Sequence, residues 1–297
     1  MAPPDATPPG ALRETVKLSE EVKAFGKTIG IEPTEALSRT TAEAPALSML
    51  WLWLQRAGTL ALRAPIDLRV AVGLAGVKEQ ARVEQVYRVD GYSIYYRQGN
   101  EFADPRALAS AGFAAEGVVR RVNVILHEDL HGDKNFALPW EVEEGIVTPL
   151  GALAAVEFFR RQGDQENSAK ALAALTEERQ VARELSALLA RADMIFSAFP
   201  REEAQKKVFD LMADYPTYRR RFQRQIQGQY PGMVLEAKLS HDAAYFRYFE
   251  RIVALREKIA DLAALITELK QIPAGTTLEQ AEKRLEELGE KFAAPAK

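Results

Sequence analysis

The chain has 297 residues, a formal net charge of −3 and no cysteine. The lack of cysteine excludes disulfides, cysteine-ligated metals and thiol nucleophiles. The weak negative charge offers no basic surface for nucleic acid, so we expect no nucleic-acid partner, and the length is ample for a large hydrophobic core.

Residues 1–10 are rich in proline and predict a disordered arm. No basic stretch followed by an apolar one is present, which indicates a cytoplasmic protein for the chain as given. If a signal had been removed, a periplasmic or membrane-anchored protein would be expected instead. Residues 11–28 are amphipathic and predict a helix. Its expected core positions are Leu12, Val16, Val22 and Phe25.

The most apolar stretch is residues 47–54, which is too short for a membrane span of about 20 residues. We predict a buried helix there, with contact to a membrane surface or a partner as the alternative. Residues 66–74 alternate in polarity and predict a strand or a short helix. Residues 83–98 resemble a β-hairpin that turns at Asp90-Gly91.

Two of the three histidines lie in the segment His127-Glu128-Asp129-Leu130-His131, behind an apolar run. On a helix, His127 and His131 share one face about 6 Å apart along the axis, within reach of one zinc ion. On a strand they would be about 13 Å apart. We therefore predict a buried helix that begins near residues 113–116, although the β-branched residues before the motif also fit a strand. Glu128 is then placed to take a proton from a metal-bound water.

A catalytic zinc ion usually has three protein ligands, so a third is sought after the turn-like residues 132–136. Pro139 could precede or open the next helix, which we expect to be buried from Gly145 to Gly163. Glu141, Glu143 and Glu144 compete for the ligand role, and we choose Glu144. The others would be acids that favour a helix N-terminus. Thr148, one turn beyond Glu144, could orient that ligand or have no role.

From Gln165 onward the pattern is helical and charged. Four helices are expected, near residues 166–193, 201–228, 240–271 and 277–292, with breaks at the proline and glycine clusters between them. The basic group formed by Arg219, Arg220, Arg221 and Arg224 suggests a solvated helix face, or a grip for a substrate carboxylate.

The motif, the Gly132-Asp133 turn and Glu144, thirteen positions after His131, resemble bacterial predicted zinc aminopeptidases, a gluzincin-type family. The likeness covers roughly residues 85–270. The sequence departs from the family pattern in three places: Glu143 replaces an asparagine, residues 137–140 are inserted, and Gly132-Asp133 follows His131 at once. The resemblance implies one Zn²⁺ per chain and a peptide substrate held along the edge of a small sheet.

His241, Tyr245 and Tyr248 share one helical face in a segment where that family carries an asparagine-rich helix and aromatic residues. One of them, His241 first, could donate a hydrogen bond to the oxyanion of the reaction. Alternatively, Ser240 or Asp242 caps the helix and the tyrosines pack in the core. Glu141 or Glu143 could hold the α-amine of a substrate.

The sequence therefore predicts a mainly α (α+β) fold, with a zincin-like helical core, a small flanking sheet and a long C-terminal helical region. It would form a single domain over residues 11–292, with a zinc-site part at 11–164 and a helical part at 165–292. The expected function is zinc-dependent peptide-bond hydrolysis, with Glu128 as general base. The alternatives are a catalytically silent zinc-binding protein and a helical interaction module.

Overall fold

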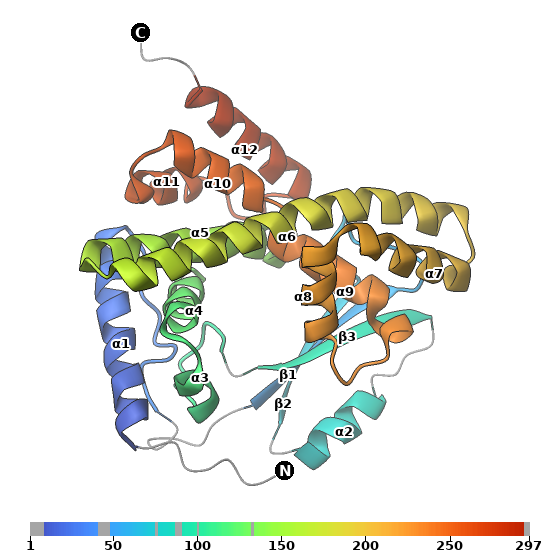
Figure 1. Cartoon of the computed structure of the whole chain (residues 1–297), viewed down its shortest axis with the longest axis horizontal. Helices are drawn as coiled ribbons and strands as arrows, with labels where there is room; N and C mark the ends of the chain where they lie inside the picture. Colours follow the sequence, from blue (N-terminus) through green and yellow to red (C-terminus); the bar gives the residue numbers. More distant parts are fainter. Residues whose placement is uncertain are drawn as a thin grey trace. The chain divides into compact units, whose positions relative to one another are not determined.

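The computed structural model describes residues 9–40, 48–74, 77–86, 91–99, 101–131 and 134–293. Most of the described chain is helical and one small antiparallel sheet is present, which confirms the predicted fold class (Figure 1). The Gly132-Asp133 turn and most of the proline-rich arm lie outside the described residues.

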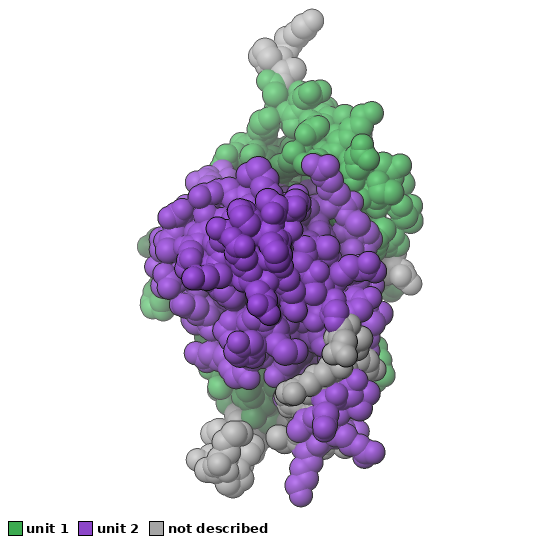
Figure 2. Space-filling model, turned by 90° about the vertical axis from the view of Figure 1, so that its right-hand side faces the viewer, with its two compact units in different colours: residues 1–47, 100–175, 251–297 green, residues 48–99, 176–250 purple. Residues whose placement is uncertain are grey.

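The chain divides into two compact units, each built from separate stretches of sequence (Figure 2). The first unit comprises residues 1–47, 100–175 and 251–297, and the second comprises residues 48–99 and 176–250. The His-Glu-x-x-His motif at residues 127–131 belongs to the first unit and the sheet to the second. The prediction of a single domain stays a prediction.

The first unit contains α1 (Pro9–Thr28), α3 (Ala111–Ala115), α4 (Val118–Leu130), α5 (Trp140–Gln162), α11 (Leu262–Leu269) and α12 (Leu278–Lys291). The second contains β1 (Ser48–Arg56), β2 (Leu68–Leu74), α2 (Val77–Val86), β3 (Tyr92–Gly99), α7 (Arg201–Leu211), the 3₁₀ turn η1 (Met212–Asp214), α8 (Pro216–Gln225) and α9 (Pro231–Phe246). The sequence boundaries between the units fall within α6 (Gln165–Ala198) and α10 (Phe249–Lys258).

The helix α4 carries the motif, as the spacing of His127 and His131 predicted, and begins at Val118 after Gly117. Its apolar side chains at Val122, Ile125 and Leu126 are buried, so packing overrides the strand preference of its β-branched residues. The helix α1 packs beside it and against α5, where the rings of Phe25 and Phe158 meet edge to face at 5.4 Å.

The helix α5 begins at Trp140, five residues earlier than the predicted buried stretch, with Pro139 as its N-cap. It ends at Gly163, whose φ of 71° is the left-handed conformation that glycine adopts readily. In the last turn, Arg160 pairs with Glu157 through two hydrogen bonds of 2.7 and 2.9 Å. Both ends of α5 are therefore defined by local sequence.

The strands are ordered β2-β1-β3, and both pairs are antiparallel. The predicted helix at residues 47–54 is wrong, because residues 48–56 form the central strand β1. Leu50, Leu52 and Leu54 are buried in the cluster on one face, while Trp53 on the other face packs against Tyr95 and His241. Because both faces of β1 are covered, its sequence is a continuous apolar run rather than an alternating one.

The predicted hairpin over residues 83–98 is only half right. Its second arm is the strand β3, but β3 pairs with β1, and the first arm is replaced by the end of the helix α2. Gly91 has a φ of 81°, as a turn there requires, and Asp90 lies outside the described residues. Residues 66–74 contain β2, one of the two alternatives predicted.

The outer edge of β3 is capped by a side chain. The backbone N–H of Tyr96 donates to Oε1 of Gln229 at 3.1 Å, and Nε2 of Gln229 donates to the carbonyl of Tyr96 at 2.9 Å. The carboxamide of Gln229 thus forms the pair of hydrogen bonds that a neighbouring strand would form.

The C-terminal region is helical as predicted but more divided. The segment predicted at residues 201–228 breaks at Pro216, and the one at 240–271 begins earlier, at Pro231, and is divided between α9, α10 and α11. Of the basic group, Arg219 and Arg220 are exposed, while Arg221 pairs with Glu178 at 2.7 Å. Within the described ranges, the helices are all too short or too polar to cross a membrane.

Candidate metal centre

Two neighbouring helices bring the predicted ligands together. His127 lies in the last turn of α4, and His131 ends that helix with extended backbone angles, φ −68° and ψ 163°. Glu144 lies near the start of α5. The Nε2 atoms of the two histidines are 3.2 Å apart, and Oε2 of Glu144 is 3.4 Å from Nε2 of His127 and 3.6 Å from Nε2 of His131.

These three distances match the donor set of a tetrahedral zinc ion. Bonds of about 2.0–2.1 Å to nitrogen and oxygen place neighbouring ligand atoms of a tetrahedron about 3.4 Å apart. The observed spacings of 3.2 to 3.6 Å bracket that value. The described residues therefore supply three converging ligand atoms that fit one Zn²⁺.

A glycine lets the two helices approach closely at this point. A Cβ atom added to Gly151 of α5 would lie 3.2 Å from Cβ and 3.3 Å from Cα of His127, and 3.0 Å from Oδ1 of Asn123. Such contacts with the backbone of α4 would force the helices apart. Gly151 therefore permits the close packing that brings Glu144 to the histidines.

The C-terminal part of α4 is fixed by Asp129, which lies inside the motif and is fully buried. Its Oδ1 atom accepts hydrogen bonds from Nζ of Lys23 on α1 and from both the backbone N–H and the hydroxyl of Thr34. Asn135 donates to the backbone carbonyl of Asp129. These bonds fix the last turn of α4, just before His131, against α1 and Asn135.

Two residues at the start of α5 contact the side chains of the predicted metal ligands. Oε1 of Glu143 lies 2.6 Å from Nδ1 of His131, and Nε1 of Trp140 donates to Oε1 of Glu144 at 3.0 Å. The sequence interpretation missed both roles, assigning Glu143 to the substrate amine and Trp140 to an insertion. A signal was available, because Trp140 precedes Glu144 by one helical turn and so shares its face.

The charges of the triad are strongly coupled. Burial alone would lower the pKa of His131, but the carboxylates of Glu144 and Glu143 raise it well above the usual value. Burial likewise opposes ionisation of Glu144, but His131 and His127 hold the pKa of Glu144 well below its usual range. The cluster therefore favours a carboxylate opposite a positive charge, which a proton on His131 supplies.

Glu128 interacts electrostatically with this triad, whereas Thr148 forms no hydrogen bond to it. Glu128 is half-buried and contributes electrostatically to the raised pKa of His131, so its carboxylate lies near the ligands. Oγ1 of Thr148 is buried and makes no hydrogen bond to any described residue, and Trp140 is a donor to Glu144. Of the two alternatives for Thr148, the structure agrees with the one in which it has no role toward Glu144, and Trp140 makes the contact with that carboxylate instead.

His241 and Tyr245, predicted as oxyanion donors, lie on α9 in the second unit. Nδ1 of His241 is 2.9 Å from Oδ1 of Asp242, and its ring lies 4.4 Å from that of Trp53, 5.0 Å from that of Tyr95 and 4.6 Å from that of Tyr245. Burial, partly offset by Asp242, lowers the pKa of His241 to about 4. A neutral ring that donates from Nδ1 has an acceptor at Nε2, which does not suit an oxyanion donor. The catalytic roles of His241 and Tyr245 stay predictions.

Asp242 joins His241 to a larger buried network. Nζ of Lys238 contacts both oxygens of the Asp242 carboxylate, and the hydroxyl of Tyr218 donates to Oδ2 at 2.8 Å. Asp242 therefore belongs to a charge-balanced core cluster rather than to a cap of α9. Tyr248 is buried, as the alternative reading of the tyrosines predicted, and Tyr245 is half-buried.

Comparisons with models of protein families, with curated proteins and with solved structures give no match for this chain.

Proposed function

We propose that this chain is a zinc-dependent hydrolase of peptide bonds, with aminopeptidase activity as the specific expectation. The observation that carries the proposal is the convergence of two imidazole nitrogens and one carboxylate oxygen at 3.2 to 3.6 Å. Two histidines and a glutamate are a ligand set of catalytic zinc sites, which leave one position open. The resemblance to bacterial zinc aminopeptidases supports the same activity.

Zinc, when bound by His127, His131 and Glu144, would acidify water and polarise the carbonyl of a substrate. Glu128 is the general base in this proposal. Its carboxylate is half-buried and electrostatically coupled to His131, so it can take a proton from water beside the ligands and later give it to the leaving amine.

The selectivity for a free N-terminus would require a further carboxylate near the ligands. Two were predicted from sequence, Glu141 and Glu143. One carboxylate oxygen of Glu143 contacts Nδ1 of His131, and the other accepts a hydrogen bond from the backbone N–H of Leu138. Both oxygens therefore already interact with the protein. Glu141, in the first turn of α5, is the second candidate for binding the substrate amine.

The test is elemental analysis of the purified protein beside the His131→Ala variant, followed by peptide hydrolysis assays of the parent and Glu128→Gln. We expect about one zinc per chain in the parent and in Glu128→Gln, almost none in His131→Ala, and cleavage by the parent alone. Zinc without cleavage would indicate a catalytically silent zinc-binding protein. No zinc in any variant, even after addition, would leave the helical interaction module.

A further inference from the structure

The two oxygens of the Glu144 carboxylate have different surroundings. Oε2 faces the Nε2 atoms of His127 and His131 at 3.4 and 3.6 Å. Oε1 accepts a hydrogen bond of 3.0 Å from the indole of Trp140. Because Glu144 is only 6% exposed, few rotations are open to its carboxylate, and the indole bond selects one of them. One oxygen is thus presented to the metal position and the other is held by the protein.

The ring nitrogen of His131 that does not face the metal position also has a partner. Oε1 of Glu143 lies 2.6 Å from Nδ1 of His131, and Oε2 of Glu143 accepts from the backbone N–H of Leu138 at 3.3 Å. A proton on Nδ1, shared with this carboxylate, leaves the lone pair on Nε2, which faces His127 and Glu144. The position of Glu143 is in turn fixed by the backbone that leads into α5.

From these contacts we propose that Trp140 and Glu143 are positioning residues that make the centre four-coordinate. Trp140 restricts Glu144 to coordination through one oxygen, and Glu143 orients His131 to bind through Nε2. This inference rests on the proposed metal site.

The consequence is a preference for one class of metal ion. Two imidazoles, one carboxylate oxygen and one water make a tetrahedral set, which suits Zn²⁺ and Co²⁺. If both oxygens of Glu144 were bound, the same residues would provide four ligand atoms and water a fifth, as larger coordination shells require. The three ligand residues alone would allow either coordination number. The hydrogen bond from the indole of Trp140 therefore selects the lower one.

The experiment uses the full chain loaded with Co²⁺, whose visible absorption is intense with four ligands and weak with six. We expect an intense band in the parent and a weaker, shifted band in Trp140→Phe, because the second oxygen of Glu144 becomes available. The affinity for Zn²⁺ should fall by about 10–100-fold in Trp140→Phe, the usual effect of removing such a partner. Trp51→Phe, in the second unit, is the matched control and should change neither quantity.

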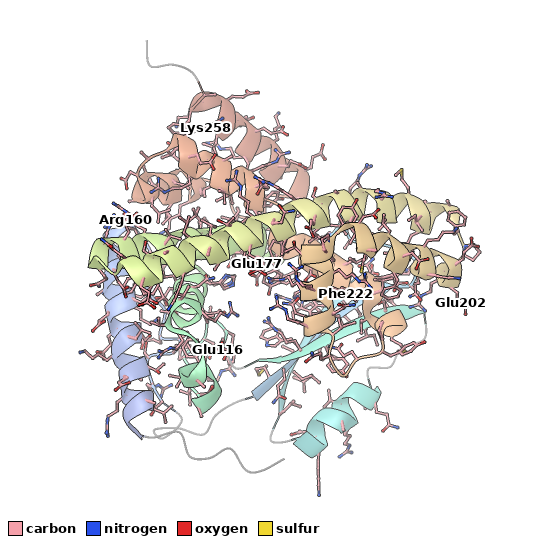
Figure 3. The ribbon with its side chains drawn as sticks, viewed as in Figure 1. Glu116, Arg160, Glu177, Glu202, Phe222 and Lys258 are labelled. Carbon is pink, nitrogen blue, oxygen red and sulfur yellow. The ribbon has the colours of Figure 1, made fainter. Side chains whose placement is uncertain are left out.

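Glu143 is tested by a graded pair of variants. Glu143→Leu removes the acceptor for Nδ1 and should weaken Zn²⁺ binding by about 10–100-fold. Glu143→Gln keeps an acceptor oxygen and should recover part of that loss, a rescue that a merely structural role would not produce. Glu116→Gln, on an exposed glutamate of the same unit (Figure 3), should bind as the parent does.

The possible results separate the inference from the proposed function. A parent that binds neither Co²⁺ nor Zn²⁺ overturns both. If the parent binds these metals and the variants show the same bands and affinities, the inference alone is overturned. Circular dichroism and thermal unfolding of the metal-free variants establish that they fold, and Trp140→Met replaces Trp140→Phe if the latter does not.

Discussion

Each of the two units contains a buried polar cluster built from histidine and carboxylate. In the second unit, the charge of Asp242 is balanced from within by Lys238, with further bonds from Tyr218 and His241. In the first, the proposed ligand atoms of His127, His131 and Glu144 face one another, and the positive charge is a proton on His131 that the proposed metal ion would replace. The same residue types thus form a structural network where a lysine supplies the cation, and the proposed metal site where no lysine does so.

The largest expected effect comes from breaking the balance of the second cluster. Lys238→Met leaves the buried carboxylate of Asp242 without its cation, so the free energy of unfolding should fall by about 3–5 kcal/mol. Urea unfolding followed by circular dichroism measures this. Lys78→Met, at an exposed lysine, should change stability little, and zinc content should be unaffected in both. A loss below about 1 kcal/mol would contradict the assigned balance.

The second cluster should also respond to acid. Burial lowers the pKa of His241 from 6.5 to about 4, so the unfolded chain takes up a proton near pH 6.5 that the folded protein takes up only near pH 4. The unfolding free energy should therefore decrease as the pH falls from 6.5 to 4, by at most about 3 kcal/mol. A His241→Gln variant, measured over the same range, should show a flatter dependence. An equal slope in both proteins would assign the effect to other groups.

The first cluster should respond to metal instead. On the proposal that zinc binds the folded chain and not the unfolded one, a free concentration of one hundred times the Kd should add about 2.7 kcal/mol to stability. Removal by a chelator should lower the Tm of the parent and leave that of His131→Ala unchanged. If the chelator lowered both equally, the effect would lie outside the triad.

The smallest expected effect tests the spacing of α4 and α5. Gly151→Ala should separate the helices by a few tenths of an ångström at His127 and weaken zinc binding about tenfold, or 1.4 kcal/mol. Gly289→Ala, in α12, is the matched control, because its added Cβ would meet only the end of Lys258 at 3.9 Å. Competition with a chromophoric chelator measures the affinity. Unchanged binding in Gly151→Ala would mean that α4 yields without moving His127.

The grouping of His127, His131 and Glu144 was predictable because the spacing of the two histidines restricts the secondary structure on which they can share a metal ion. A histidine pair spaced by four residues shares a metal only on a helix, which decided the structure of α4 against its β-branched composition. The choice of Glu144 among three acids also agrees with the observed convergence, since Glu143 faces Nδ1 of His131 instead.

The remaining features depend on contacts distant in sequence. The apolar run of β1 is compatible with a buried helix or a doubly covered strand, and only pairing with β2 and β3 distinguishes them. Lys238 and Asp242 have the spacing of an ordinary surface ion pair, and their burial follows from the packing of α9 on the sheet. Gly151 carries no local turn signal, because its role is the approach of another helix.

The side chain of Gln229 occupies backbone groups of β3 that a strand of another chain could otherwise bind. An unpaired strand edge is a template on which another chain can add its own strand, which is how many sheets begin to aggregate. By occupying the N–H and carbonyl of Tyr96, the carboxamide blocks that template at mid-strand. A single polar side chain thus protects the outer edge of β3 against pairing with a strand of another chain.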